Sequence, residues 1–150
     1  MKRIMAIDYG DARIGIALTD PLQIISSGFK TIPNNKESYD TIYNICIEKD
    51  VESIVVGIPF DQNSKIGDAA KKVLSFVKNL QNYFKQKQFE LPFYEEDERY
   101  STRDALEAMR EMKVKNNKKK ELVDTIAAAN ILSSFMRNRQ KIKLELDKYK

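Results

Sequence analysis

A short, uninterrupted run of β-branched residues in the middle of the chain constrains the fold most. Residues 53–57 read Ser-Ile-Val-Val-Gly, and Pro59 ends the run. A strand without alternating polar residues is typical of a sheet that is buried on both faces. Amphipathic helical patterns flank this run at residues 36–49 and 65–85, where apolar residues recur at helical spacing. We therefore expect an α/β domain in which helices cover a sheet.

Further strands and helices are predicted on both sides of this run. Two short apolar segments, 3–8 and 13–18, lie on either side of a glycine-containing turn and predict a β-hairpin, and residues 27–32 predict a third strand. A strand over 91–96 follows, with helices over about 101–112 and 118–136. This order indicates a mixed sheet in one domain. We assign residues 1–137 to the domain and residues 138–150 to a basic, helical C-terminal extension.

Composition excludes several classes of protein. Cys46 is the only cysteine, which excludes internal disulfides and cysteine-rich zinc sites. The chain has no His, which removes the usual serine-hydrolase triad and His-ligated metals. No apolar stretch approaches the ~20 residues of a membrane-spanning helix. Asp8 interrupts the apolar residues after Met1-Lys2-Arg3 too early for a signal peptide, so we expect a cytoplasmic protein.

Charge is distributed unevenly along the chain. Residues 1–112 carry 15 Lys and Arg against 18 Asp and Glu, whereas residues 113–150 carry 11 against 4. A basic C-terminal quarter on an acidic body suits a polyanionic partner such as nucleic acid. The alternative is that these lysines only solvate long helices.

Carboxylates stand at three unusual positions in the predicted elements. Asp8 ends an apolar strand, at the edge where α/β sheets place ligands. Asp124 shares a helix face with apolar residues, where an isolated charge is costly. The acidic run Glu95–Glu98 leaves a strand. The alternatives are a turn or capping role for Asp8, an ion pair with Lys or Arg for Asp124, and an exposed turn for the acidic run.

Together these carboxylates indicate one kind of chemistry. Hard divalent ions such as Mg²⁺ and Mn²⁺ prefer oxygen ligands. Two such ions can activate a water molecule and stabilise both the attacking and leaving oxygens of a phosphodiester, so that no protein base is strictly needed. An acid-rich site without His, beside a basic helix, suits this reaction and suits acyl or hydride transfer poorly.

Five sequence motifs occur in a fixed order along the chain. They are Asp8-Tyr9-Gly10 with Arg13-Ile14-Gly15 and Asp20, then Val55-Val56-Gly57-Ile58-Pro59, then Gly67, Ala70 and Phe76, then Asp97-Glu98-Arg99-Tyr100-Ser101-Thr102, and finally Lys118-Lys119-Lys120 with Val123-Asp124 and Ile126-Ala127-Ala128. This ordered set resembles the YqgF family of ribonuclease H-like proteins related to RuvC. Members of that family are linked with Holliday junction resolution and with nuclease processing of pre-16S ribosomal RNA. Asp11-Ala12 and Tyr100 depart from the family pattern.

The resemblance implies a fold, a site and a substrate. It implies a ribonuclease H-like fold with a five-stranded mixed sheet, its first three strands antiparallel, flanked by helices. It implies that Asp8, Glu98 and Asp124 are the catalytic residues and hold Mg²⁺ or Mn²⁺. The implied activity is metal-dependent hydrolysis of phosphodiester bonds, with the 5′ end of pre-16S ribosomal RNA as substrate and ribosome assembly intermediates as partners, by a monomer or a homodimer.

Basic residues beside this acidic triad are candidates for substrate binding. Arg13 could clamp a phosphate through its planar guanidinium or pair with a nearby acid. Lys118, Lys119 and Lys120 precede Asp124 and could contact the backbone of a nucleic acid independently of its sequence, or only face solvent. Two other functions stay open at this point: resolution of branched DNA by the same chemistry, and nucleic-acid binding without catalysis.

Overall fold

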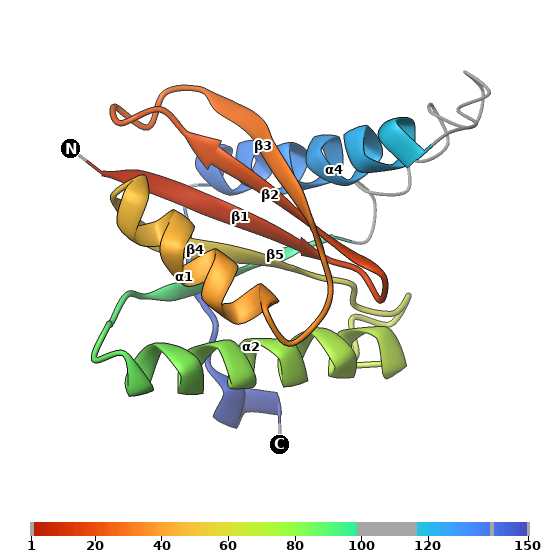
Figure 1. Cartoon of the computed structure of the whole chain (residues 1–150). Coiled ribbons are helices and arrows are strands. Elements are labelled where there is room, and N and C mark those ends of the chain that lie inside the picture. The colour runs from red at the N-terminus through yellow and green to blue at the C-terminus, as the bar shows by residue number, and fades with distance from the viewer. Residues whose placement is uncertain (1, 99–116, 139, 150) are drawn as a thin grey trace.

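The computed structural model of the protein describes residues 2–98, 117–138 and 140–149, with the backbone alone for residues 117–123. Its centre is one six-stranded sheet in the order β3-β2-β1-β4-β5-β6 (Figure 1). The strands are β1 (Arg3–Tyr9), β2 (Arg13–Thr19), β3 (Ser26–Pro33), β4 (Val51–Ile58), β5 (Phe93–Asp97) and β6 (Ile142–Lys143).

The sheet is mixed, as predicted. Strands β1, β2 and β3 form an antiparallel meander, whereas β4 pairs parallel with both β1 and β5. The sequence predicted these five strands; the short sixth strand, β6, pairs antiparallel with β5 and was not predicted. The carboxyl ends of β1, β4 and β5 consequently meet at one edge of the sheet, the usual position of ligand sites in α/β proteins.

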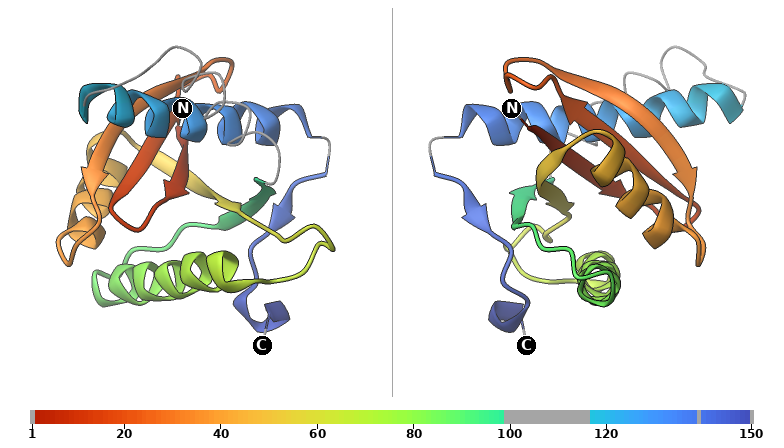
Figure 2. Two further views of the ribbon diagram at one scale, coloured as in Figure 1. Left: turned by 90° about the vertical axis from the view of Figure 1, so that its right-hand side faces the viewer. Right: turned by 60° about the vertical axis from the view of Figure 1, so that its left-hand side comes forward.

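Helices cover both faces of the sheet. Helices α1 (Ser38–Glu48) and α2 (Asp68–Gln86) lie on one face and α4 (Asn117–Arg137) lies on the other (Figure 2). β1 shows why each face is covered, because alternate residues point to opposite sides. Met5 and Ile7 join the core under α1 and α2, and Ile4 and Ala6 join the core under α4. The helix predicted over 101–112 lies outside the described residues.

The C-terminal extension differs from the prediction. Instead of a continuous α-helix, it contains β6 and a four-residue 3-10 helix, η1 (Leu146–Tyr149). Leu144 between them is buried, and its N–H donates to the carbonyl of Phe93 at 2.9 Å. The prediction of a helical extension is therefore wrong, because burial of Leu144 and pairing with the β5 edge hold this segment against the domain. No described helix is long and apolar enough to span a membrane.

Candidate functional site

Two of the three predicted carboxylates come from the strands on either side of β4. Asp8 lies one residue before the end of β1, and Glu98 directly follows β5. The backbone N–H of Glu98 donates to the carbonyl of Ile58 at 3.1 Å, at the end of β4, and this bond holds the residue beside the sheet edge. Glu98 is buried, with 8% of its surface exposed, and Asp8 is half-buried.

The third carboxylate, Asp124, arrives on α4, which packs unusually close to β2. Gly15 pairs with Asp8 across β1 and β2. A Cβ atom on Gly15 would lie 2.2 Å from the backbone oxygen of Asp124, so only a glycine fits under this turn of the helix. Ala127 and Ala128 are buried on the same helix, and small side chains on both surfaces permit the approach. The packing therefore brings Asp124 over the strand pair that carries Asp8.

The position of the Glu98 side chain also depends on a glycine. A Cβ on Gly57 of β4 would lie 2.8 Å from Oε2 of Glu98 and 2.6 Å from Cδ1 of Ile131. Gly57 thus leaves the space that the Glu98 side chain and α4 occupy. It belongs to the segment whose resemblance to the YqgF family the sequence already showed, and the structure supplies the physical reason for a glycine there.

The three acids interact electrostatically. Burial, a hydrogen bond with Glu98 and the charges of Glu98 and Asp124 raise the pKa of Asp8 well above its ordinary value. Two carboxyl groups in hydrogen-bonding contact share a proton more readily than they carry two charges, because like charges repel strongly where water is scarce. A site of this kind favours a proton or a cation between the carboxylates.

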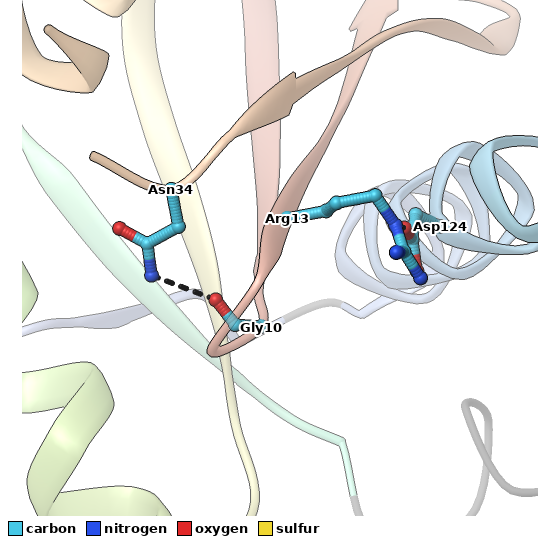
Figure 3. A network of polar contacts seen from close by, with 4 residues as sticks. All are labelled: Gly10, Arg13, Asn34 and Asp124. Atoms are coloured by element: carbon cyan, nitrogen blue, oxygen red, sulfur yellow. Dashed lines mark hydrogen bonds and ion pairs between the residues drawn. The ribbon is translucent and has the colours of Figure 1, made fainter. Parts of the chain in front are cut away.

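Asp124 has a second partner. Its Oδ2 accepts a hydrogen bond from Nε of Arg13 at 2.9 Å, and the two side chains form an ion pair (Figure 3). The side chains are 37% exposed for Arg13 and 22% for Asp124. The pairing of Arg13 with a nearby acid, one of the two interpretations offered by the sequence, is what the structure contains.

The β1–β2 turn beside these residues is held by hydrogen bonds from Asn34. The carbonyl of Gly10 accepts a hydrogen bond from Nδ2 of Asn34 at 2.8 Å (Figure 3), and the N–H of Asn34 donates to the carbonyl of Ala12 at 3.0 Å. A Cβ on Gly10 would lie 2.5 Å from the oxygen of Arg13. Asn34 therefore fixes the turn that positions Arg13, a role that no pattern in the sequence indicated.

The donor set suits a hard divalent cation in its chemistry. Only carboxylate oxygens are offered, which Mg²⁺ and Mn²⁺ prefer, and burial together with the neighbouring Glu98 and Asp124 raises the pKa of Asp8. Among the described residues, however, no group of three or more acidic, Cys or His side chains is spaced to hold one ion as it stands. The ion pair with Arg13 accounts for the orientation of Asp124.

The remaining predicted residues divide into two groups. Lys118, Lys119 and Lys120 lie in the first turns of α4, and their side chains are outside the described part of the structure. Arg99, Ser101 and Thr102 also lie outside it. Glu95 and Glu96 are buried, so the acidic run is not an exposed turn.

Glu95 and Glu96 have structural partners on opposite faces of β5. Glu95 accepts a hydrogen bond from Oη of Tyr149 at 2.6 Å and pairs with Nζ of Lys148 at 3.2 Å. Glu96 accepts from Oγ of Ser134 at 2.8 Å and from Nδ2 of Asn138 at 2.7 Å. These contacts give the two glutamates a structural role, because Glu95 links β5 to the C-terminal segment and Glu96 links β5 to the end of α4.

Comparison with known proteins identifies the family. The sequence model of the family described as "RuvX: Holliday junction resolvase" matches residues 2–138. The chain belongs to this family. The YqgF resemblance drawn from the motifs is confirmed.

Curated relatives of this RuvX-family chain cover almost its whole length. A protein of Bacteroides fragilis named "Putative pre-16S rRNA nuclease" is 37% identical over 142 residues, which is 93% of this chain and 99% of the relative. A protein of Clostridium botulinum with the same name is 36% identical over 141 residues, with 93% and 99% covered.

Solved structures agree with the fold. RuvC of Thermus thermophilus in complex with a Holliday junction substrate gives a TM-score of 0.57 at 15% identity, covering 96% of this chain and 100% of that chain. A second structure of RuvC from the same organism gives a TM-score of 0.55 at 11% identity, covering 95% of this chain and 99% of that chain. The ribonuclease H-like fold predicted for this RuvX-family chain is confirmed.

Proposed function

We propose that this protein is a divalent-metal-dependent nuclease in which Asp8, Glu98 and Asp124 form the catalytic, metal-binding site. The single observation that carries the proposal is that three carboxylates from β1, the end of β5 and α4 meet at the carboxyl edge of the sheet. The raised pKa of Asp8 beside Glu98 and Asp124 supports it, because perturbed carboxylates at such an edge are typical of catalytic sites. The nuclease class follows from the family and from the names of its curated members.

The proposed roles combine the contacts of Asp8 and Arg13 with the position of Lys118, Lys119 and Lys120 in the first turns of α4. Asp8 and Glu98, already in contact, offer two adjacent oxygen ligands, and Asp124 completes the set by turning away from Arg13. Bound Mg²⁺ or Mn²⁺ would supply an activated water and stabilise the oxygens of an in-line displacement. Arg13 then faces the phosphate with its planar guanidinium, which can hold two oxygens at once. Lys118, Lys119 and Lys120 hold the adjoining backbone.

The proposed substrate is the 5′ end of pre-16S ribosomal RNA, supported by the names of the relatives that cover the chain. Such a substrate places the protein in the cytoplasm, beside ribosome assembly intermediates. Branched DNA is the second candidate, because the family is described as Holliday junction resolvase. Junction cleavage requires two symmetric cuts, so this second function also implies a homodimer.

The test is cleavage of two end-labelled substrates, a pre-16S leader RNA and a DNA four-way junction, each with Mg²⁺, Mn²⁺ or EDTA. We expect metal-dependent cleavage of the RNA. The variants Asp8→Asn and Asp124→Asn should lower the rate by at least about a hundredfold, because neutral amides cannot hold the ions as carboxylates do. Glu48→Gln, at the exposed end of α1, is the matched control and should cleave normally.

Each other outcome has a defined meaning. Cleavage of the junction in preference to the RNA moves the function to DNA recombination. Unchanged cleavage by Asp124→Asn removes that residue from the mechanism. Binding of both substrates without cleavage under any metal condition contradicts the nuclease and leaves a nucleic-acid-binding protein.

A further inference from the structure

Helix α2 carries a basic stripe on its exposed side, away from the carboxylate site. The stripe consists of Lys71, Ser75, Lys78, Asn82 and Lys85, all exposed. These residues recur at intervals of three and four and therefore lie along one line of the helix, about 21 Å long from Lys71 to Lys85 at 1.5 Å per residue. No acidic residue interrupts the stripe, and Asp68 in the first turn is the only acid in the helix.

Hollows with aromatic or apolar walls border the stripe. One of about 370 Å³ is lined by Tyr9 and Tyr39 together with Lys71 and Lys72. A second, of about 630 Å³, lies between α2 and the C-terminal segment, where Leu146, Tyr149 and the acidic Asp147 face Lys71 and Lys78; Figure 2 shows this segment beside α2. A third, of about 530 Å³, has Phe89 and Pro92 beside Lys85 and Glu90, with the buried Phe84 at its base.

The stripe begins at the same rim of the molecule as the carboxylate site. Nζ of Lys72 pairs with Oδ2 of Asp11 at 3.3 Å, which ties the first turns of α2 to the β1–β2 turn. Tyr9, in the first hollow, directly follows Asp8 in β1 and points to the opposite face of the sheet. A chain leaving the carboxylates over the β1–β2 turn would therefore reach Lys71 first and Lys85 last.

We propose that this surface, the α2 stripe with its hollows, binds the single-stranded segment that flanks the bond to be cleaved; the proposal rests on the function proposed above. Lysines in a line contact successive phosphates, and aromatic walls beside them accept unpaired bases. The combination distinguishes single strands from duplexes, whose bases are already stacked and paired. An anionic lipid surface fits less well, because none of the exposed large apolar residues among those described belongs to α2.

The test measures binding independently of cleavage, with Asp8→Asn present in every protein. The probe is a fluorescent single-stranded RNA of about 12 nucleotides, a length within the range of known single-strand sites. The stripe variant combines Lys71→Gln, Lys78→Gln and Lys85→Gln. The control variant removes the same charge through Lys2→Gln, Lys30→Gln and Lys49→Gln, which lie before β1, on the edge strand β3 and after α1. Circular dichroism and thermal unfolding verify that both variants are folded.

We expect the stripe variant to bind the RNA at least about tenfold more weakly than the parent protein. We also expect the slope of log K against log salt concentration to become less steep by about two, because three phosphate contacts to a single strand are lost. The control variant should bind as the parent does. If both variants lose the same affinity for the RNA, binding depends only on net charge, and the proposal is overturned. Stronger binding of duplex RNA, or of vesicles with anionic lipid, than of single-stranded RNA overturns it too.

The result separates this inference from the nuclease function. If wild-type protein cleaves its substrate while the stripe variant binds single strands normally, the α2 surface is not a binding site and the nuclease proposal stands. If no cleavage is found under any metal condition but the stripe variant alone loses binding, the surface stands and the nuclease proposal fails.

Discussion

The carboxyl group of Asp8 lies where negative charge is costly to the metal-free fold. Because its pKa is raised in the folded protein by burial and by Glu98 and Asp124, its contribution to stability is complete below the unfolded pKa and is lost as the pH rises through the folded pKa. At neutral pH the free protein therefore bears a strain that a cation or a neutral side chain relieves. This is the usual opposition of stability and function at an active site.

Asp8→Asn should accordingly stabilise the metal-free protein. The amide is neutral, has nearly the same shape and can donate a hydrogen bond to Glu98, so we expect a gain of about 1–2 kcal/mol in the free energy of unfolding near pH 8. The gain should shrink towards pH 4, where the aspartic acid is itself protonated. Urea unfolding in EDTA at both pH values measures it. A variant less stable than the wild type near pH 8 contradicts the electrostatic account.

At the scale of elements, the contact between α4 and the sheet depends on glycines. Gly15, Gly28 and Gly57, on β2, β3 and β4, each face atoms of α4 closer than a Cβ atom allows. The helix α4 therefore packs closer to the sheet than side chains larger than glycine would permit. This short distance between helix and sheet determines the position of Asp124 relative to Asp8.

Gly15→Ala tests this dependence. The new methyl group would meet a backbone oxygen of α4 at 2.2 Å, and a backbone atom cannot move without the helix. We expect a loss of about 2–3 kcal/mol in unfolding free energy, as for an overpacked core, together with reduced cleavage because Asp124 is displaced. Gly67→Ala is the matched control, since nothing lies within 4 Å of its Cβ position. Equal stability of the two variants would show that α4 adjusts freely.

The elements were predictable from sequence where a periodic pattern exists. The uninterrupted apolar run at 53–57 lies in β4 (Val51–Ile58), and the helical pattern at 65–85 corresponds to α2 (Asp68–Gln86). Both were predictable because a strand buried on two faces and a helix buried along one stripe each require a regular pattern of apolar residues. Asp124 was expected on the inner face of its helix, and it lies over Gly15.

The contacts that no local pattern records were not predictable. The sequence offered an ion pair as one alternative for Asp124 and for Arg13, but it could not join the two, because they lie 111 positions apart and meet only where the glycines let α4 pack close to the sheet. β6 has two exposed residues, so neither alternation nor hydrophobicity marks it as a strand. In both cases tertiary packing, rather than local propensity, determines the outcome.

At the scale of the whole molecule, the C-terminal segment closes one edge of the sheet. β6 pairs with β5, which would otherwise expose an edge. Nζ of Lys141 donates to the carbonyls of Phe135 and Asn138 at 3.2 and 2.9 Å and so caps the end of α4. Tyr149 and Lys148 satisfy the buried Glu95. One short segment thus links the sheet edge, α4 and the buried acid, and it also forms a wall of the hollow beside α2.

Removal of residues 140–150 should therefore destabilise the domain rather than shorten a tail. The buried side chain of Leu144 and the partners of Glu95 are lost together, and we expect a loss of about 3 kcal/mol or more in unfolding free energy, from one buried leucine and the hydrogen bonds of one buried acid. Full-length Ile142→Thr, changed at an exposed position of β6, should differ from wild type by less than about 1 kcal/mol. Urea unfolding compares the three proteins. A truncated chain as stable as the full-length chain would show that the segment contributes nothing to the stability of the domain.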